Sequence, residues 1–226
     1  MLRGVPLLKN PFTFDERGFQ FQEGQGGGGV PIWLTPNGDK LALYHFEMPP
    51  DIEADLADKG GLRVFYRAIA HRAGLGVLET ETIVVDGHLA VRTLFKMAQG
   101  RHGLTYIGAL TFPFRDFSYV FRVESSELGV TGIRETYVTA KLLSTQKMPE
   151  VFPSGWLDDP YDSNESGPMT RNISERPEYD SLFPDHPLSR ARHVLDHLHH
   201  SITIDNSVKK LPKFTFDQNP SRHHRT

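Results

Sequence analysis

Three histidines near the C-terminal end of the chain have the clearest potential for chemistry. His193, His197 and His200 recur at helical spacing, and two histidines four residues apart on a helix can chelate zinc. Zinc hydrolases place a glutamate between such histidines, whereas here Asp196 directly precedes His197 and no third ligand is evident. On a helical wheel the three side chains lie opposite the apolar positions. We interpret them as a solvent-facing stripe, and whether they bind a metal stays open.

Paired carboxylates are the second group of candidates. Glu79 and Glu81 alternate along one predicted strand, but glycosidases need two carboxylates that face each other across a cleft. Two acids on one antiparallel strand more often form its wet face. The chain also lacks the Gly-x-Ser-x-Gly turn of serine hydrolases. We therefore predict no catalytic residues, no cofactor and no metal, although a triad assembled only in space stays an alternative.

The segment from Trp156 to Asp162 is the most promising place for a partner. It sets Trp156 and Tyr161 among Asp158, Asp159 and Asp162 in a region without periodicity. Exposed aromatic residues on loops make good anchors for binding another protein. We predict these five residues as partner-binding residues. The alternative is that Trp156 packs onto the sheet and orders the long loop.

Composition narrows the possible functions. The chain has 226 residues and a net charge of −3, which argues against nucleic-acid binding because that depends on Lys and Arg contacts to phosphate. There is no cysteine, so disulfides and thiolate chemistry are excluded. No apolar stretch is long enough for a signal peptide or a membrane-spanning helix. We expect a cytoplasmic protein that binds neither nucleic acid nor membrane.

Hydrophobic periodicity predicts strands interrupted by helices. Strands are expected at Phe12–Phe21 (a hairpin), Val30–Leu34, Lys40–Met48, Val77–Val85, His88–Ala98, Leu104–Phe112 and Phe117–Val123. Helices are expected at Ile52–Ala73, Thr131–Leu143 with Thr131 as its cap, and Leu188–Ile202 with Ser189 as its cap. Short links between the later strands indicate antiparallel pairing.

The predicted fold class is α+β, with a curved antiparallel sheet of about six or seven strands packed against two or three helices and followed by a long C-terminal extension. We divide the chain into an α+β domain at 1–144, an acidic Pro/Asp-rich loop at 145–187 that wraps the domain, and a C-terminal helix with a basic, partly disordered tail at 188–226. The loop has a net charge of −6 and the final segment +4. Charges of opposite sign would let the two segments pair within the molecule.

This order of elements resembles the PsbP-like fold, which is shared by the extrinsic photosystem II protein PsbP and the Ran-binding Mog proteins. The strand and helix from Lys40 to Ala73, the Val84–His88 hairpin and the strand pair from Gly108 to Val123 carry the resemblance. It is topological and covers about Pro11 to Leu143. The chain resembles an uncharacterised bacterial branch of that fold. Known members act mainly as docking modules, so the resemblance implies binding rather than catalysis.

We therefore expect a non-enzymatic docking or adaptor module whose partner is another protein, attracted to the acidic segment if its own surface is basic. The alternative is a small-molecule binder or hydrolase with a pocket between the sheet and the 145–187 loop. Free edge strands could also pair between copies, which makes a homo-oligomer possible.

Overall fold

A computed structural model describes residues 10–23, 29–100, 103–145, 155–162, 164, 167 and 169–216. Part of the predicted acidic loop, residues 146–154, and the predicted disordered tail from residue 217 lie outside these described residues. No helix in the described part of the chain is both long and apolar enough to cross a membrane.

The strands are β1 (Phe12–Thr13), β2 (Gln20–Phe21), β3 (Ile32–Leu34), β4 (Lys40–Phe46), β5 (Gly76–Val85), β6 (His88–Ala98), β7 (Leu104–Pro113), β8 (Ser118–Ser126) and β9 (Thr203–Ile204). The helices are α1 (Lys59–Arg72), α2 (Ile133–Ser144), α4 (Pro187–Ser201) and α5 (Asn206–Lys209), with 3₁₀ turns η2 (Ile173–Glu175) and η3 (Pro177–Leu182).

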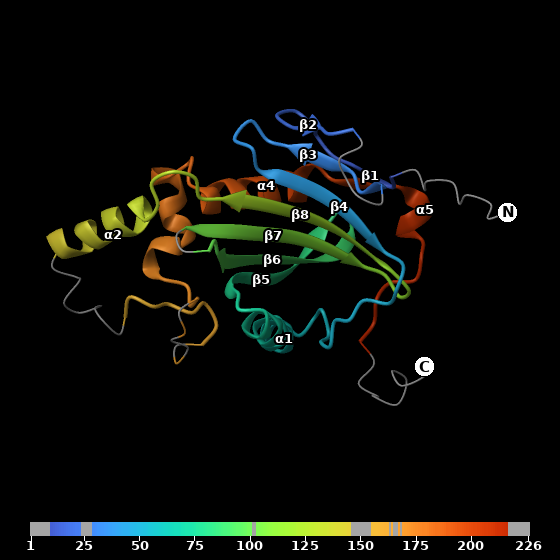
Figure 1. Ribbon diagram of the computed structural model, residues 1–226. Coiled ribbons are helices and arrows are strands. Elements are labelled where there is room, and N and C mark those ends of the chain that lie inside the picture. The colour runs from blue at the N-terminus through green and yellow to red at the C-terminus, as the bar shows by residue number, and fades with distance from the viewer. Residues whose placement is uncertain are drawn as a thin grey trace.

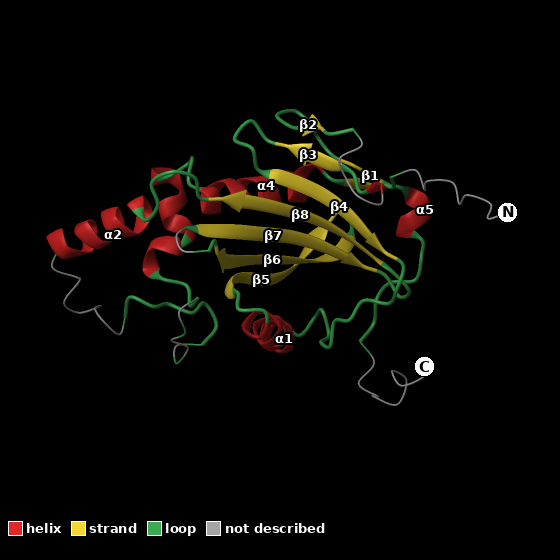
Figure 2. Ribbon diagram, viewed as in Figure 1, coloured by secondary structure: helices red, strands yellow, loops and turns green. Residues whose placement is uncertain are grey.

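Seven of the strands form one antiparallel sheet in the order β2-β3-β4-β8-β7-β6-β5. The four longest strands, β5 to β8, are consecutive in the chain and also neighbours in the sheet. They are neighbours because each link between them is short enough to allow only an antiparallel return beside the preceding strand. The β5–β6 turn is Asp86-Gly87, and both residues have positive φ, as a two-residue hairpin turn requires. The predicted fold class, an antiparallel α+β sheet with helices, is confirmed (Figures 1 and 2).

Helix α4 packs across the back of the sheet in Figure 1 and supplies much of the core. Its fully buried Leu188, Ala191, Leu195 and Leu198 join apolar side chains of β4 to β8 in one cluster. Gly108 on β7 permits the close approach, because a Cβ there would lie 2.8 Å from Leu195 Cδ1. Residues from 1–144 and from 188–226 therefore share one hydrophobic core.

Helix α1 packs along β5 and covers the other face of the sheet. Leu62 of α1 and Val91 of β6 belong to a second, smaller apolar cluster, together with Ile52, Ala54 and Leu56. The helix begins at Lys59, where Asp58 caps the amides of Gly60 and Gly61. The predicted start at Ile52 is therefore wrong: residues 52–56 form an irregular lead-in whose apolar side chains pack under the sheet.

The predicted N-terminal hairpin is also wrong. Strand β1 pairs with β9 in a separate two-stranded sheet, where Phe12 faces Ile204, while β2 pairs with β3. Phe12 is buried against Phe112, Tyr119 and Phe121. Burial of this aromatic ring outweighs a local turn, because a short isolated hairpin is barely stable in water.

Two predicted helix caps are wrong. Gly132, in the left-handed conformation, precedes α2 in place of Thr131. His186 caps α4, and its ring accepts a hydrogen bond from the Leu188 amide. The hydroxyl of Ser189 instead donates to the Asp180 carboxylate.

Candidate functional site

Helix α2 projects from one end of the sheet (Figure 1), and a fully buried arginine attaches it to the body of the protein. Arg134 Nε donates to the carbonyl of Ser174 at 2.5 Å, and Nη1 donates to Ser189 Oγ at 2.9 Å. Nη2 donates to the carbonyl of Arg176 and to Asp180 Oδ1. All three guanidinium nitrogens have partners, so the charge is compensated despite its burial.

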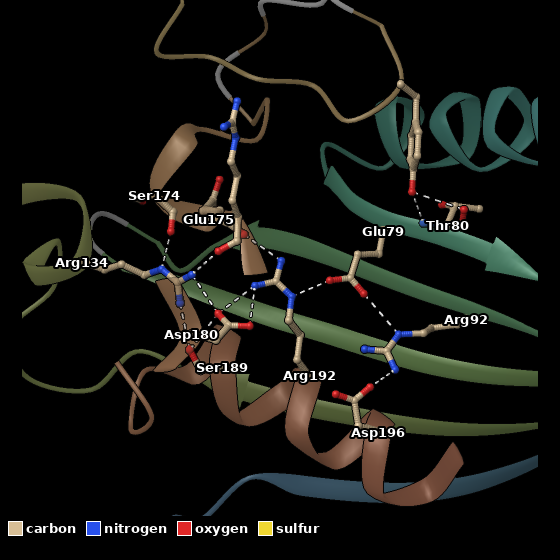
Figure 3. Close-up of polar contacts among 12 residues, drawn as sticks. Glu79, Thr80, Arg92, Arg134, Ser174, Glu175, Asp180, Ser189, Arg192 and Asp196 are labelled. Carbon is tan, nitrogen blue, oxygen red and sulfur yellow. Dashed lines mark hydrogen bonds and ion pairs between the residues drawn. The ribbon is translucent and has the colours of Figure 1, made fainter. Parts of the chain in front are cut away.

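The same Asp180 begins a chain of alternating charges that runs under α4 to the edge of the sheet (Figure 3). Arg192 of α4 bonds both oxygens of Asp180 and, at 2.5 Å, Glu79 Oε1 on β5. Glu79 in turn accepts from Arg92 of β6, which also reaches Asp196. Burial disfavours the charge on Arg192, but Glu79 and Asp180 raise its pKa above the ordinary value.

A second buried pair lies near this network. Lys96 Nζ on β6 is 2.6 Å from Glu175 Oε2 and also donates to the Thr170 carbonyl. Tyr106 lies opposite Lys96 on β7 and is fully buried. Burial raises the pKa of the Tyr106 hydroxyl well above 10, and nearby Glu175 adds to the shift. The Tyr106 hydroxyl is therefore protonated at neutral pH, and in that form it cannot accept a proton as a general base.

Helix α2 exposes its apolar side. Arg134 and Val138 face inward, whereas Ile133, Tyr137 and Leu143 are 57%, 49% and 56% exposed. Amphipathic helices of globular proteins normally face the core with their apolar stripe. Because the hydrogen bonds and the ion pair of Arg134, together with the burial of Val138, hold this side of α2 inward, Ile133 and Tyr137 remain exposed to solvent.

The exposed apolar surface continues beyond the helix. We call it the α2 patch, and it consists of Leu128, Val130, Ile133, Tyr137, Leu143 and Leu182. The loop residues Leu128 and Val130 are 80% and 79% exposed. Four of the six residues, with Phe183, line a groove of about 430 Å³ between the β8–α2 loop and η3. Tyr137 packs edge-on against Phe183, which links the helix to the wall of the groove.

The predicted histidine stripe is only partly on the surface. His193 and His200 are exposed, but His197 is half-buried, stacks near Phe19 and lies 2.6 Å from the Asp15 carbonyl. Within the described residues, no three His, Cys, Asp or Glu side chains are grouped so that they could hold a metal ion.

The prediction for Glu79 and Glu81 as a wet strand face is wrong for Glu79. Its side chain is 18% exposed and bonded to Arg92 and Arg192. Glu81 is exposed and lies 3.6 Å from Arg63 of α1. The two carboxylates thus have different arginine partners.

The acids of the predicted partner-binding segment are bonded within the chain. Asp158 Oδ2 accepts from Arg171 at 2.6 Å and from Arg176 at 2.9 Å. Burial alone would raise the pKa of Asp158, but these two arginines hold it below 3.8. Asp162 pairs with Arg67 of α1, and the carboxylate of Asp159 accepts from the amides of the two residues Tyr161 and Asp162.

The two aromatic residues of that segment are half-buried. The backbone carbonyl of Trp156 accepts from the Ile173 amide. The Tyr161 ring lies under the Arg63 guanidinium, 4.3 Å from its centroid, and its hydroxyl contacts the backbone of Thr80 on β5. The structure therefore brings Tyr161 and Asp162 against α1 and β5, and Asp158 against residues 171–176. Whether these residues also bind a partner stays a prediction.

Sequence reasoning missed the arginines that organise this end of the molecule. Arg192 gave one signal, because it lies four residues after Leu188 and three before Leu195, on the inward side of the predicted helix. The sequence contains no comparable signal for Arg134, because the pattern of apolar and polar residues in a helix does not show that the side carrying Arg134 faces inward.

No family model and no curated protein matches the chain. One solved structure similar to this one is the solution structure of cyanobacterial PsbP (CyanoP) from Synechocystis sp. PCC 6803. It is 14% identical, with a TM-score of 0.29, and the match covers 64% of this chain and 94% of that chain. Nothing about the fold or the function of this chain follows from a match at that TM-score.

Proposed function

We propose that this protein is a non-enzymatic docking module that binds the apolar face of a helix in another protein through the α2 patch. The observation that carries the proposal is the reversed orientation of α2, with a charged residue buried and an apolar stripe in solvent. Contiguous exposed apolar surface on a folded protein usually marks an interaction site. We further propose that the protein acts in the cytoplasm, in keeping with its lack of cysteine.

The shape of the patch favours a helical partner. Ile133 and Tyr137 are one helical turn apart, and Leu143 is exposed on an adjacent side near the end of α2. Such a ridge packs well against the apolar stripe of a second helix. The groove beside it, between Val130 and Leu182, would take a large apolar side chain of that helix.

The rigid attachment of α2 to the rest of the protein also favours binding. The base of α2 is fixed by the four hydrogen bonds of Arg134. A rigid surface loses little conformational entropy when a partner binds, so more of the contact energy appears as affinity. In contrast, Asp158 and Asp162 of the Trp156–Asp162 segment are already paired with arginines, which weakens their attraction for a basic partner.

The alternative function, a small-molecule binder with a pocket under the 145–187 loop, has less support. A cavity does lie between that loop and the C-terminal end of α1 with the start of β5, and its lining includes Ala70, Val77, Asp159 and Met169. Its volume is about 200 Å³, below the roughly 300–1,000 Å³ of most small-molecule sites.

A displayed library of amphipathic helical peptides tests the proposal directly. The native chain would be the bait, and the double variant Ile133→Glu/Leu143→Glu would be the counter-selection. We expect selected helices with one apolar face that bind the native chain at least tenfold more tightly than the double variant. Circular dichroism would establish that the variant is folded.

A second variant separates the two candidate surfaces. Asp158→Asn/Asp162→Asn removes two charges of the predicted partner-binding segment and leaves the α2 patch intact. The selected peptides should bind this variant as they bind the native chain. If they bind the patch variant equally well, or lose affinity only for the Asn variant, the α2 patch is not the docking site.

A further inference from the structure

Strand β5 is an edge of the main sheet, with β6 as its only strand neighbour among the described residues. Val85 and His88 flank the two-residue turn and form a hydrogen-bonded pair, because they close the hairpin. Alternate residues Thr80, Thr82 and Val84 therefore direct their N–H and C=O groups away from β6. A row of such groups is a template for pairing with another strand.

Tyr161 blocks the first of these positions. Its hydroxyl accepts a hydrogen bond from the Thr80 amide at 2.6 Å and donates to the Thr80 carbonyl at 3.3 Å, a contact drawn in Figure 3. Both outward backbone groups of Thr80 are thus bonded to one phenol. The contact of the Tyr161 ring with Arg63 and the ion pair of Asp162 with Arg67 hold the segment in place.

Residues from other elements also contact the other two outward positions. His199 Nε2 of α4 lies 3.1 Å from the carbonyl of Val84. Thr82 Oγ1 donates to the carbonyl of Leu56 at 2.6 Å, which holds the lead-in to α1 beside the strand. Side chains of Tyr161 and His199, rather than a strand, therefore bond three of the outward backbone groups of this edge: the N–H and C=O of Thr80 and the C=O of Val84.

The sequence of β5 is complementary to itself in one register. If two β5 strands paired antiparallel about Thr82, Thr80 would face Val84 and Glu81 would face Ile83. No acid would then lie opposite another acid, so the pairing avoids like-charge repulsion. The paired residues Thr80, Glu81, Thr82, Ile83 and Val84 are mostly β-branched, and such residues favour strands. A twofold arrangement of this kind uses the same surface on both copies.

We propose that the Trp156–Asp162 segment acts as a latch on the β5 edge. The Tyr161 hydroxyl bonds the outward N–H and C=O of Thr80 and so keeps β5 from pairing with β5 of a second copy of this chain. Opening the latch frees both outward backbone groups of Thr80. The twofold pairing about Thr82 then also displaces the His199 ring from the Val84 carbonyl. The latch lies on a different surface from the α2 patch, so the two proposals stand or fall separately.

Tyr161→Phe tests the latch, because it removes both hydrogen bonds and retains the ring over Arg63. We expect the Thr80 amide to exchange its hydrogen at least tenfold faster, and the dimer dissociation constant to fall at least tenfold in sedimentation equilibrium. Tyr179→Phe is the matched control, since Tyr179 is half-buried and distant in the chain from β5, and it should change neither quantity.

A second substitution tests the register. Thr82→Pro in the Tyr161→Phe background removes the outward N–H at the centre of the proposed pairing, and proline is tolerated on an edge strand. This double variant should return to monomer. If Tyr161→Phe proves unfolded by circular dichroism, Asp162→Asn loosens the same segment without altering the ring, and it should speed exchange at the Thr80 amide and lower the dimer dissociation constant.

Three outcomes would overturn the proposal. The first is unchanged exchange at Thr80 with no dimer in the folded latch variant. The second is faster exchange without dimer formation. The third is a dimer that persists with Thr82→Pro, or that disappears with Ile133→Glu, because it would then use another surface.

Discussion

Helices α4 and α2 meet at the same end of the molecule, but they bury apolar and charged side chains in different proportions. The inward side of α4 is mainly apolar and includes Leu195, whereas α2 turns Arg134 inward and Ile133 outward. Hydrophobic burial therefore dominates the orientation of α4, whereas the polar contacts of Arg134, with buried Val138, orient α2. The comparison shows that a helix attached through charges can leave its apolar stripe free for another molecule.

The largest expected effect is the loss of apolar contact at α4. Leu195→Ala should lower the free energy of unfolding by about 3–5 kcal/mol, because it leaves a cavity between α4 and the sheet at Gly108. Urea denaturation measures this change. His193→Ala, on the exposed side of the same helix, should change stability by less than about 0.5 kcal/mol. Equal effects would mean that burial does not orient α4.

The matching change at α2 removes its charged attachment. Arg134→Met should cost about 2–3 kcal/mol, since it leaves the buried carbonyl of Ser174 and the half-buried carbonyl of Arg176 without their donor. Hydrogen exchange should also rise across α2 but not across α4. Lys141→Met, an exposed basic residue on the same helix, is the control. A stability of α2 unaffected by Arg134→Met would contradict its attachment by ion pairs.

A smaller, pH-dependent effect is expected from Asp158. Its pKa in the folded state lies below 3.8, so folding favours the charged form. The stabilisation is present above about pH 4 and is lost as the pH falls through the lowered pKa. Asp158→Asn should therefore destabilise the protein by about 1 kcal/mol or less at pH 6. The difference between native and variant should shrink at pH 2; a constant difference would point to lost packing rather than charge.

The smallest effect is expected on the outward side of α2. Ile133→Ser should alter the free energy of unfolding by less than about 0.5 kcal/mol, because the side chain already lies in solvent. Val138→Ala, on the inward side, should cost about 2 kcal/mol by the loss of buried apolar area. Thermal denaturation of the pair measures the contrast. If Ile133→Ser is as destabilising as Val138→Ala, the stripe belongs to the core and not to a docking surface.

Much of the fold was predictable because it depends on local patterns. Alternation along β5 to β8 and the Asp86-Gly87 turn predict the central hairpins within a few residues. The pairing of β1 with β9 was not predictable, because the two strands lie almost two hundred positions apart in the chain. Only the burial of Phe12 in a common core brings them together.

The candidate site was less predictable than the fold. Trp156, Asp158, Asp159, Tyr161 and Asp162 stood out by residue type, but their arginine and backbone partners come from α1, β5 and residues 171–176. The α2 patch did not stand out, because Ile133 and Tyr137 suggest an ordinary inward stripe in the sequence. The orientation of a helix depends on what its two sides meet, which a single segment does not contain.

The sequence by itself determined the class of the fold, since side-chain periodicity and turn residues act over a few neighbouring positions. Tertiary structure decided which charges are paired, which edge of the sheet is covered and which side of α2 faces water. Those outcomes depend on the free energy of moving each charged or apolar group out of water beside partners that are distant in the chain. That free energy exists only once the elements have packed.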